Sequence, residues 1–413
     1  MIIDILTAPG MGAFFYDDQQ AIRAGALQEG FIYNGTPQTP GFSSIRMPAR
    51  SLSVGLVLAD GAILWGDMLT VQYSGIAGRE PVFNITEAKK IIEELKPRLL
   101  QIHFKDIRHD LKMLFLPLKN EQHVPLSIQY GISQAILSAY AHLLRLTMTE
   151  VLVHAYSLPM ILRPVPIYAQ SGDDRYNQTQ KMILKRVEIL PHGLFNSPAK
   201  LGTKGEKLLE FVQWITQQIA QAGDANYYPA LHFDVYGTIG LEFGLDAESI
   251  ASYIEQLAKA AAPFQLHIES PADYGSSEAQ INGYIKIRQA LKNRGCSAKI
   301  VADEWCDTLE DIRQFAQQGA ADIIQIKLPD AGCLLNSMDA AILCKQHGIG
   351  VYIGGSCTET DLSARASVHV AVATQADMQL AKPGMGVDEA LSITGNEQSR
   401  LMAILKTKYP LLT

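Results

Sequence analysis

The chain has 413 residues, 47% of them hydrophobic and 19% charged, and its net charge is -7. This length allows two or three domains, and the acidic balance argues against a nucleic-acid-binding surface, which requires excess lysine and arginine. The five cysteines form no CxxC pair, so the sequence indicates neither a disulfide framework nor a thiolate zinc site.

The first residues do not have the pattern of a targeting signal. They include early acidic side chains and lack a basic region followed by a sustained apolar run, so we expect no secretory signal. The longest uncharged stretch, 122–144, contains glutamine, serine and histidine, which a bilayer core would reject. We therefore expect no membrane segment and a reducing, cytoplasmic location.

Residues 1–160 show the pattern of an α+β unit. Two apolar runs within 52–65 flank an Asp-Gly pair, which tolerates the positive φ angles that tight hairpins require. Helical periodicity follows over about 85–95 and 127–146. The prolines between 158 and 166 interrupt regular hydrogen bonding, so we place a domain boundary between residues 160 and 161.

From 161 to 413, short apolar runs alternate with helical patterns, as in βαβ units. Eight such runs are the number that a TIM-like (β/α)8 barrel requires, so the predicted fold class is α/β. A doubly wound sheet is the alternative, but no Gly-x-Gly-x-x-Gly motif opens a helix after a strand. The expected strands are 165–169, 187–190, 231–235, 264–268, 298–302, 322–326, 350–353 and 377–381, and helices such as 247–262 and 276–294 lie between them.

Four consecutive expected strands end in an ionisable residue: Asp234, Glu269, Asp303 and Lys327. The carboxyl ends of barrel strands converge on one mouth, so these side chains would share a cavity. A single acid after a strand is usually a helix N-cap, but three in register repel one another unless one is protonated or a cation binds between them. Carboxylate oxygens suit Mg²⁺, whereas sulfur or imidazole would suggest zinc. The three acids are therefore a candidate Mg²⁺ site.

Lys327 interrupts a buried apolar run in the segment QIKLPD. A salt bridge at the strand end is the structural alternative to a catalytic role. Beside a divalent cation the ammonium form is disfavoured, so a neutral lysine could act as a base. A lysine base next to carboxylate-bound Mg²⁺ is suited to removing a proton α to a carboxylate, with the metal stabilising the ene-diolate.

Eight segments along the chain carry a resemblance to a known family. They are FFYDDQQAI (14–22), VQYSGIAGR (71–79), AQSGDDRY (169–176), LPHGL (190–194), HFDVYGTIG (232–240), VADEWC (301–306), QIKLPD (325–330) and AKPGMGVDE (381–389). Together they resemble the enolase superfamily and, within it, the methylaspartate ammonia-lyases.

The resemblance implies an enolase-like architecture, in which 1–160 form a capping domain over a catalytic barrel. It implies reversible elimination of ammonia from threo-3-methylaspartate, a small amino-dicarboxylate, to give mesaconate through a metal-stabilised enolate. The reaction would depend on Mg²⁺, with a monovalent cation such as K⁺ as activator. It also implies a homodimer that acts in amino-acid degradation such as glutamate fermentation.

Roles for individual residues follow from the same resemblance. Lys327 would take the C3 proton of the (2S,3S) substrate, and His192 would lie on the opposite face, assisting at the enolate or serving the C3 epimer. Gln72 would belong to a cap that excludes water. The implied substrate-binding residues are Gln170 and Gln325 for a carboxylate, Ser356 and Cys357 for the other carboxylate, and Tyr168, Tyr352 and Leu380 for the methyl and amine pocket.

The chain departs from the family pattern at Ser356, usually Thr, at Thr358, usually Asn, at Leu328 directly after Lys327, and at 331–333. These departures concern substrate preference more than reaction type. The alternatives are another superfamily lyase, dehydratase or epimerase acting on a related amino or hydroxy acid, a metal-free barrel in which Lys327 forms a Schiff base, and a non-catalytic scaffold. A Lys-x-Lys pair on the second barrel strand, common among the dehydratases and epimerases, is absent from the sequence.

Overall fold

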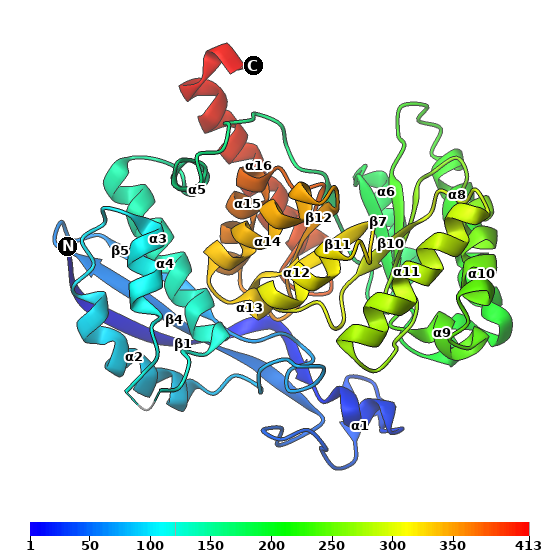
Figure 1. The fold of residues 1–413 in the computed structure, drawn as a ribbon, viewed down its shortest axis with the longest axis horizontal. Helices are drawn as coiled ribbons and strands as arrows, with labels where there is room; N and C mark the ends of the chain where they lie inside the picture. The colour runs from blue at the N-terminus through cyan, green and yellow to red at the C-terminus, as the bar shows by residue number, and fades with distance from the viewer. Residues whose placement is uncertain (120, 413) are drawn as a thin grey trace.

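The N-terminal part of the chain folds around an antiparallel sheet with the strand order β1-β4-β5 (Figure 1). The computed structural model describes residues 1–119 and 121–412. Strands β4 and β5 form the hairpin that the sequence predicted, and Gly61 in its turn has a φ of 88°, which glycine adopts without strain. The strands are β1 (Ile2–Asp17), β4 (Arg46–Leu58) and β5 (Ile63–Met68), with the short pair β2 (Leu27–Glu29) and β3 (Ile32–Asn34) beside them.

Helix α4 (Leu126–Leu144) packs closely against this sheet and is buried along most of its length. A Cβ atom on Gly66 of β5 would lie only 2.0 Å from the carbonyl oxygen of Gly131, so the two glycines permit the close approach. Helix α4 also contacts α13 (Leu328–Ala331) of the barrel and thereby links the two parts. The other helices of this part are α1 (Gln19–Arg23), α2 (Ile85–Leu99), α3 (Ile107–Leu114) and α5 (Met148–Ala155).

Eight parallel strands then close into a barrel in the order β6-β7-β8-β9-β10-β11-β12-β13. This confirms the predicted fold class, and each strand overlaps one of the expected segments. The pairing of β13 with β6 closes the ring and excludes the doubly wound alternative. The strands are β6 (Ile167–Tyr168), β7 (Ile189–Leu194), β8 (Ala230–Asp234), β9 (Leu266–Glu269), β10 (Lys299–Ala302), β11 (Ile323–Lys327), β12 (Gly350–Gly354) and β13 (Met378–Leu380).

Helices surround the barrel and connect its strands (Figure 1). The longer ones are α6 (Arg175–Leu184), α8 (Glu206–Gln221), α10 (Ala247–Ala261), α11 (Ser277–Asn293), α12 (Leu309–Gln317), α14 (Leu334–Gln346), α15 (Asp361–Thr374) and α16 (Val387–Lys408). Short helical turns are α7 (Pro198–Leu201), η1 (Thr203–Gly205), α9 (Thr238–Phe243) and η2 (Pro410–Leu412). Over the described ranges, no single helix has the length and apolar character to cross a membrane, and α4 with α5 pass that test only as a pair bent by 95°.

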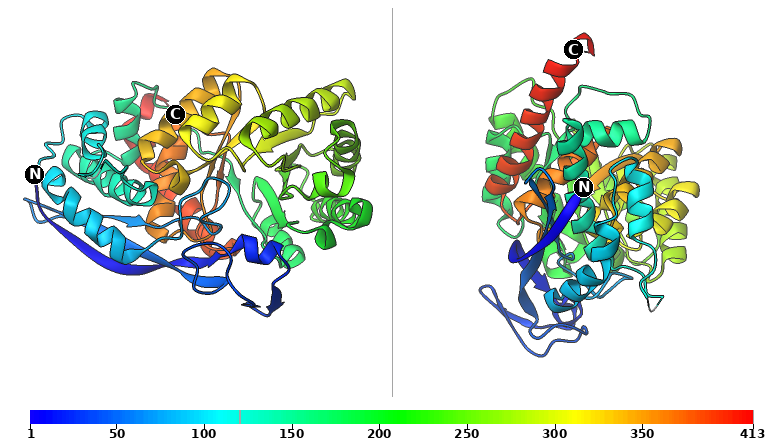
Figure 2. Two further views of the ribbon diagram at one scale, coloured as in Figure 1. Left: turned by 60° about the horizontal axis from the view of Figure 1, so that its bottom comes forward. Right: turned by 90° about the vertical axis from the view of Figure 1, so that its left-hand side faces the viewer.

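The N-terminal part meets the barrel at the segment that follows β12. The hydroxyl of Thr358 donates to the carbonyl oxygen of Thr70 at 2.8 Å, and the amide of Ala13 donates to the carbonyl oxygen of Glu359 at 3.1 Å. In Figure 2 the blue N-terminal strands run along one side of the molecule and reach the barrel. Because this segment leaves the carboxyl end of a barrel strand, the N-terminal part covers the barrel end at which active sites of this fold lie.

Candidate active site

A cavity lies at the carboxyl end of the barrel strands, between the barrel and the loop that follows β5. It brings together most of the site residues that the sequence predicted, although they come from both parts of the chain. Those that line it are Gln72, Gln170, His192, Asp234, Glu269, Asp303, Gln325, Lys327, Ser356, Cys357 and Leu380.

Tyr168 and Tyr352, expected in the methyl and amine pocket, do not line this cavity among the residues that the structure describes. They belong instead to the cluster that fills the barrel interior, together with Leu380, and both are fully buried. Their rings lie 4.3 Å and 5.6 Å from that of His232. Residues in strands alternate between the inside and the outside of a barrel, and these two tyrosines point to the inside. They pack there with Leu380, which lines the cavity, and so support the cavity from below.

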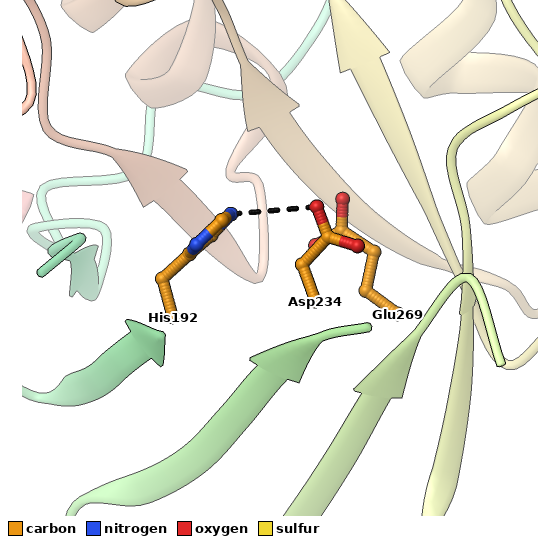
Figure 3. A group of neighbouring side chains, drawn as sticks. All are labelled: His192, Asp234 and Glu269. Carbon is orange, nitrogen blue, oxygen red and sulfur yellow. Dashed lines mark ion pairs between the residues drawn. The ribbon is translucent and has the colours of Figure 1, made fainter. Parts of the chain in front are cut away.

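The carboxylates of Asp234 and Glu269 lie together with the ring of His192 (Figure 3). Each of these residues offers one ligand atom, and the three atoms lie within 4.8 Å of one another; Nε2 of His192 is 3.5 Å from Oδ2 of Asp234. The sequence predicted Asp303 as the third member of this group. In the structure, Asp303 lies in the same cavity but its carboxylate pairs with Nζ of Lys327 at 2.6 Å, because a buried ammonium requires a compensating anion.

Glu269 is fully buried and held on both oxygens. Nε2 of His232 lies 2.6 Å from one oxygen, and Nε2 of Gln325 donates to the other at 3.1 Å. Burial raises the pKa of Glu269, and the neighbouring Asp234 and Asp303 raise it further. A cation would relieve this repulsion, and a donor set of carboxylate oxygens fits a hard ion such as Mg²⁺.

The ammonium group of Lys327 is stabilised by the acids around it. Burial and Arg79 lower the pKa of Lys327, but Asp303, Glu304 and Asp307 outweigh both, so its pKa is raised. The sequence predicts a neutral lysine at this position beside a bound divalent cation, whereas the pairing with Asp303 stabilises the ammonium form. A cation bound by Asp303 would withdraw this stabilisation and favour the neutral amine.

Arg79 is a part of the site that sequence reasoning missed. Its buried guanidinium comes from the loop after β5 and lies 2.8 Å from Asp307, 3.1 Å from Asp330 and 3.8 Å from Asp303. It therefore ties the N-terminal part to the acidic side of the barrel mouth. The available sequence signal was its place in the segment 71–79.

Sequence reasoning also missed Lys382. This residue follows β13 at the carboxyl end of the barrel strands, the same end at which Lys327 closes β11. Its side chain lines the cavity, and Nζ donates to Oε1 of Gln170 at 2.7 Å. Burial lowers the pKa of Lys382, and Cys357 and Glu359 act in the opposite direction. Gln170 thus pairs with a cation, whereas Gln325 donates to Glu269, so the two amides have different surroundings.

Gln72 joins the capping loop to the segment after β12. Its backbone amide donates to the hydroxyl oxygen of Ser356 at 3.1 Å, and the thiol of Cys357 donates to its Oε1 at 3.1 Å. Its Nε2 donates to Asp17 at 2.6 Å. Burial raises the pKa of the Cys357 thiol to about 11, so this cysteine is a hydrogen-bond donor rather than a thiolate.

An eight-stranded barrel under an N-terminal α+β part, with acids and then a lysine on successive strand ends, defines the enolase class of fold. Solved structures support the fold: the L-Ala-D/L-Glu epimerase from Bacillus subtilis has a TM-score of 0.63 at 18% identity and covers 94% of this chain and 90% of its own. The muconate lactonizing enzyme from Pseudomonas putida has a TM-score of 0.60 at 17% identity, with 95% and 88% covered.

Two family models match almost the whole chain: the methylaspartate ammonia-lyase N-terminus over 1–157 and its C-terminus over 159–407. Methylaspartate ammonia-lyase 2 of Carboxydothermus hydrogenoformans is 46% identical over 98% of this chain and 99% of its own length. The methylaspartate ammonia-lyase of Clostridium tetanomorphum is 43% identical over 98% of both chains. The chain belongs to the methylaspartate ammonia-lyase family, whose members are carbon–nitrogen lyases.

Solved structures of the same family superimpose closely. The Citrobacter amalonaticus methylaspartate ammonia lyase containing (2S,3S)-3-methylaspartic acid has a TM-score of 0.96 at 42% identity, covering 98% of this chain and 99% of its own. The β-methylaspartase of Clostridium tetanomorphum in its Mg complex has a TM-score of 0.93 at 42% identity with the same coverage.

Proposed function

We propose that this protein eliminates ammonia from threo-3-methylaspartate to give mesaconate in a Mg²⁺-dependent reaction. The observation that carries the proposal is one cavity lined by a carboxylate cluster with Lys327 and, besides these, by the hydrogen-bond donors Gln170, Ser356, Cys357 and Lys382. Such a cavity suits a dicarboxylate, since a cation at the acids would bind one carboxylate and the donors the other. The relatives named above support the substrate.

The base in this proposal is Lys327, which would take the proton from C3 of the (2S,3S) substrate. His192 projects into the cavity from a different strand and would serve the opposite face of C3. Asp234, Glu269 and Asp303 would hold the Mg²⁺. The ion, when bound, would supply positive charge to the substrate carboxylate next to C3 and so acidify the C3 proton.

The other lining residues would bind and orient the substrate. We propose that Gln325, next to Glu269, serves the carboxylate at the acidic side. Gln170, which the resemblance assigned to the same carboxylate as Gln325, would instead join Ser356 and Cys357 at the other carboxylate, because it pairs with Lys382. Gln72 in the capping loop would exclude water from the reacting carbon. Leu380 would contact the substrate methyl group, with Tyr168 and Tyr352 supporting it from the barrel interior.

Several features of the family are proposals for this chain. They are activation by a monovalent cation such as K⁺, a homodimeric assembly, a cytoplasmic location and a role in amino-acid degradation such as glutamate fermentation. We also propose that the capping and catalytic domains divide at residues 160 and 161.

The test is to incubate the protein with threo-3-methylaspartate, Mg²⁺ and K⁺ and to follow the ultraviolet absorbance of the conjugated diacid. We expect mesaconate to form, and EDTA to abolish its formation until Mg²⁺ is restored. If the protein makes no mesaconate but acts on another amino or hydroxy acid, the named substrate is wrong. Activity that survives EDTA together with borohydride trapping on Lys327 would replace the metal mechanism with a Schiff base.

A further inference from the structure

Lys382 is a buried lysine that has no carboxylate as a close partner. It is 4% exposed, yet within 1–119 and 121–412 no acidic side chain forms an ion pair with its Nζ atom within 4.0 Å. The nearby Glu359, which raises the pKa of Lys382, is bound instead by Tyr130 and by the backbone amide of Ser356. The hydrogen bond that it makes goes to the neutral amide of Gln170 at 2.7 Å. Burying an ammonium group without an anion is unfavourable, so its location in a ligand cavity indicates that the ligand supplies the negative charge.

The hydrogen bond also fixes which end of Gln170 faces the cavity. A lysine ammonium has donors and no acceptor, so Lys382 must face the carbonyl oxygen of the Gln170 amide. The NH₂ group of Gln170 then points away from Lys382 and can donate to another group. That Nε2 atom contacts the sulfur of Met385 at 2.7 Å and the carbonyl oxygen of Gly384 at 3.5 Å. Thioether sulfur is a weak acceptor, so a carboxylate oxygen would be a better partner for this donor.

Lys382 also lies on the same side of the cavity as Cys357. The backbone amide of Gly384 donates to the carbonyl oxygen of Cys357 at 3.0 Å, and a Cβ atom on Gly355 would lie 3.4 Å from Cγ of Lys382. Gln170, Ser356, Cys357 and Lys382 thus form one end of the cavity, which we call the amide end. Arg79 and Lys327, which also line the cavity, are by contrast paired with acids.

We propose that Lys382 is a specificity-determining and positioning residue that makes the amide end select a carboxylate. It holds Gln170 with its NH₂ group toward the ligand, and its own positive charge offsets the charge of the substrate carboxylate that is remote from the metal. This proposal rests on the proposed function and adds the group that discriminates dicarboxylates from monocarboxylates.

The test measures binding rather than turnover, by calorimetry on the Mg²⁺-loaded protein. The probes are mesaconate and (E)-2-methylbut-2-enoate, which keeps the carboxylate on the methyl-bearing carbon and lacks the one expected at the amide end. In Lys382→Met we expect the Kd of mesaconate to rise about 10- to 100-fold and the Kd of the monocarboxylate to change little. The loss of one hydrogen bond to a charged group weakens binding by about this factor. Lys382→Arg, which keeps the charge, should retain most of the preference.

The matched control is Lys345→Met. Lys345 is a partly buried lysine that donates to the carbonyl oxygen of Gln375 at 2.6 Å. It lies with the first residues of β11, β12 and β13, at the amino end of the barrel strands, so its loss should change neither Kd. If Lys382→Met does not fold, Lys382→Gln, which keeps a donor for Gln170 but no charge, takes its place with a smaller expected loss. A folded variant that keeps the wild-type preference for mesaconate overturns the proposal. Failure of the wild type to make mesaconate would instead refute the proposed function.

Discussion

The buried carboxylate of Glu359 is expected to stabilise both the fold and the substrate-binding loop. The hydroxyl of Tyr130 donates to one of its oxygens at 2.5 Å, and the backbone amide of Ser356 donates to the other at 2.9 Å. Glu359→Ala would leave both donors buried and unpaired. Each loss costs about 1–3 kcal/mol, so we expect a total of about 2–6 kcal/mol, a large part of the stability of a typical domain.

The assay for this variant combines urea unfolding, followed by circular dichroism, with the KM for threo-3-methylaspartate. We expect a lower unfolding midpoint and a higher KM, because the amide of Ser356 loses its anchor, and Glu359→Gln should show about half of the stability loss. The control is Asp110→Ala. The carboxylate of Asp110 also accepts a hydrogen bond from a tyrosine hydroxyl, that of Tyr140 at 2.5 Å, but it is more exposed and does not line the cavity. The reasoning is refuted if Glu359→Ala is no less stable than Asp110→Ala and keeps its KM.

Three further predictions concern single side chains. His192→Ala should lower kcat/KM for the (2S,3R) epimer by about 10²-fold or more and affect the (2S,3S) substrate less; equal losses would contradict the two-sided site. The hydrogen bond from His369 lowers the pKa of Glu397 to about 2, below the ordinary 4.5. The ionised Glu397 therefore stabilises the fold above pH 4.5, and this stabilisation is lost as the pH falls from 4.5 to about 2. Glu397→Gln should therefore flatten the decline of the urea midpoint in acid, and an unchanged decline would count against it. Since burial raises the pKa of Cys357 to about 11, iodoacetamide at about pH 8 should label the half-buried Cys296 first, as read by mass spectrometry, and early labelling of Cys357 would be inconsistent with the structure.

The strand-end residues were predictable because their signal is local. An apolar run followed by a polar residue marks the end of a barrel strand, and the fold then brings successive ends together. Asp234, Glu269, Asp303 and Lys327 do line one cavity, as expected. Lys382 has the same kind of signal, since it directly follows the expected strand 377–381, and was nevertheless missed.

Other parts of the site depend on packing that no local pattern contains. Arg79 reaches Asp330 across 251 residues of sequence, and the contact exists because the capping part packs on the barrel mouth. Asp303 pairs with Lys327 and does not join the group formed by His192, Asp234 and Glu269. Which neighbour it takes depends on the charges that lie nearest in three dimensions. Such choices are set by burial and charge balance, which a single sequence does not specify.

The central claim is that Lys327 removes the C3 proton of the substrate. The most direct measurement is the incorporation of solvent deuterium at C3 of (2S,3S)-3-methylaspartate during incubation in D₂O with Mg²⁺ and K⁺, followed by nuclear magnetic resonance. We expect exchange and mesaconate formation in the wild type, and a loss of both by about 10²- to 10⁴-fold in Lys327→Ala, the usual contribution of a general base. Exchange at the wild-type rate in a folded Lys327→Ala protein would contradict the account.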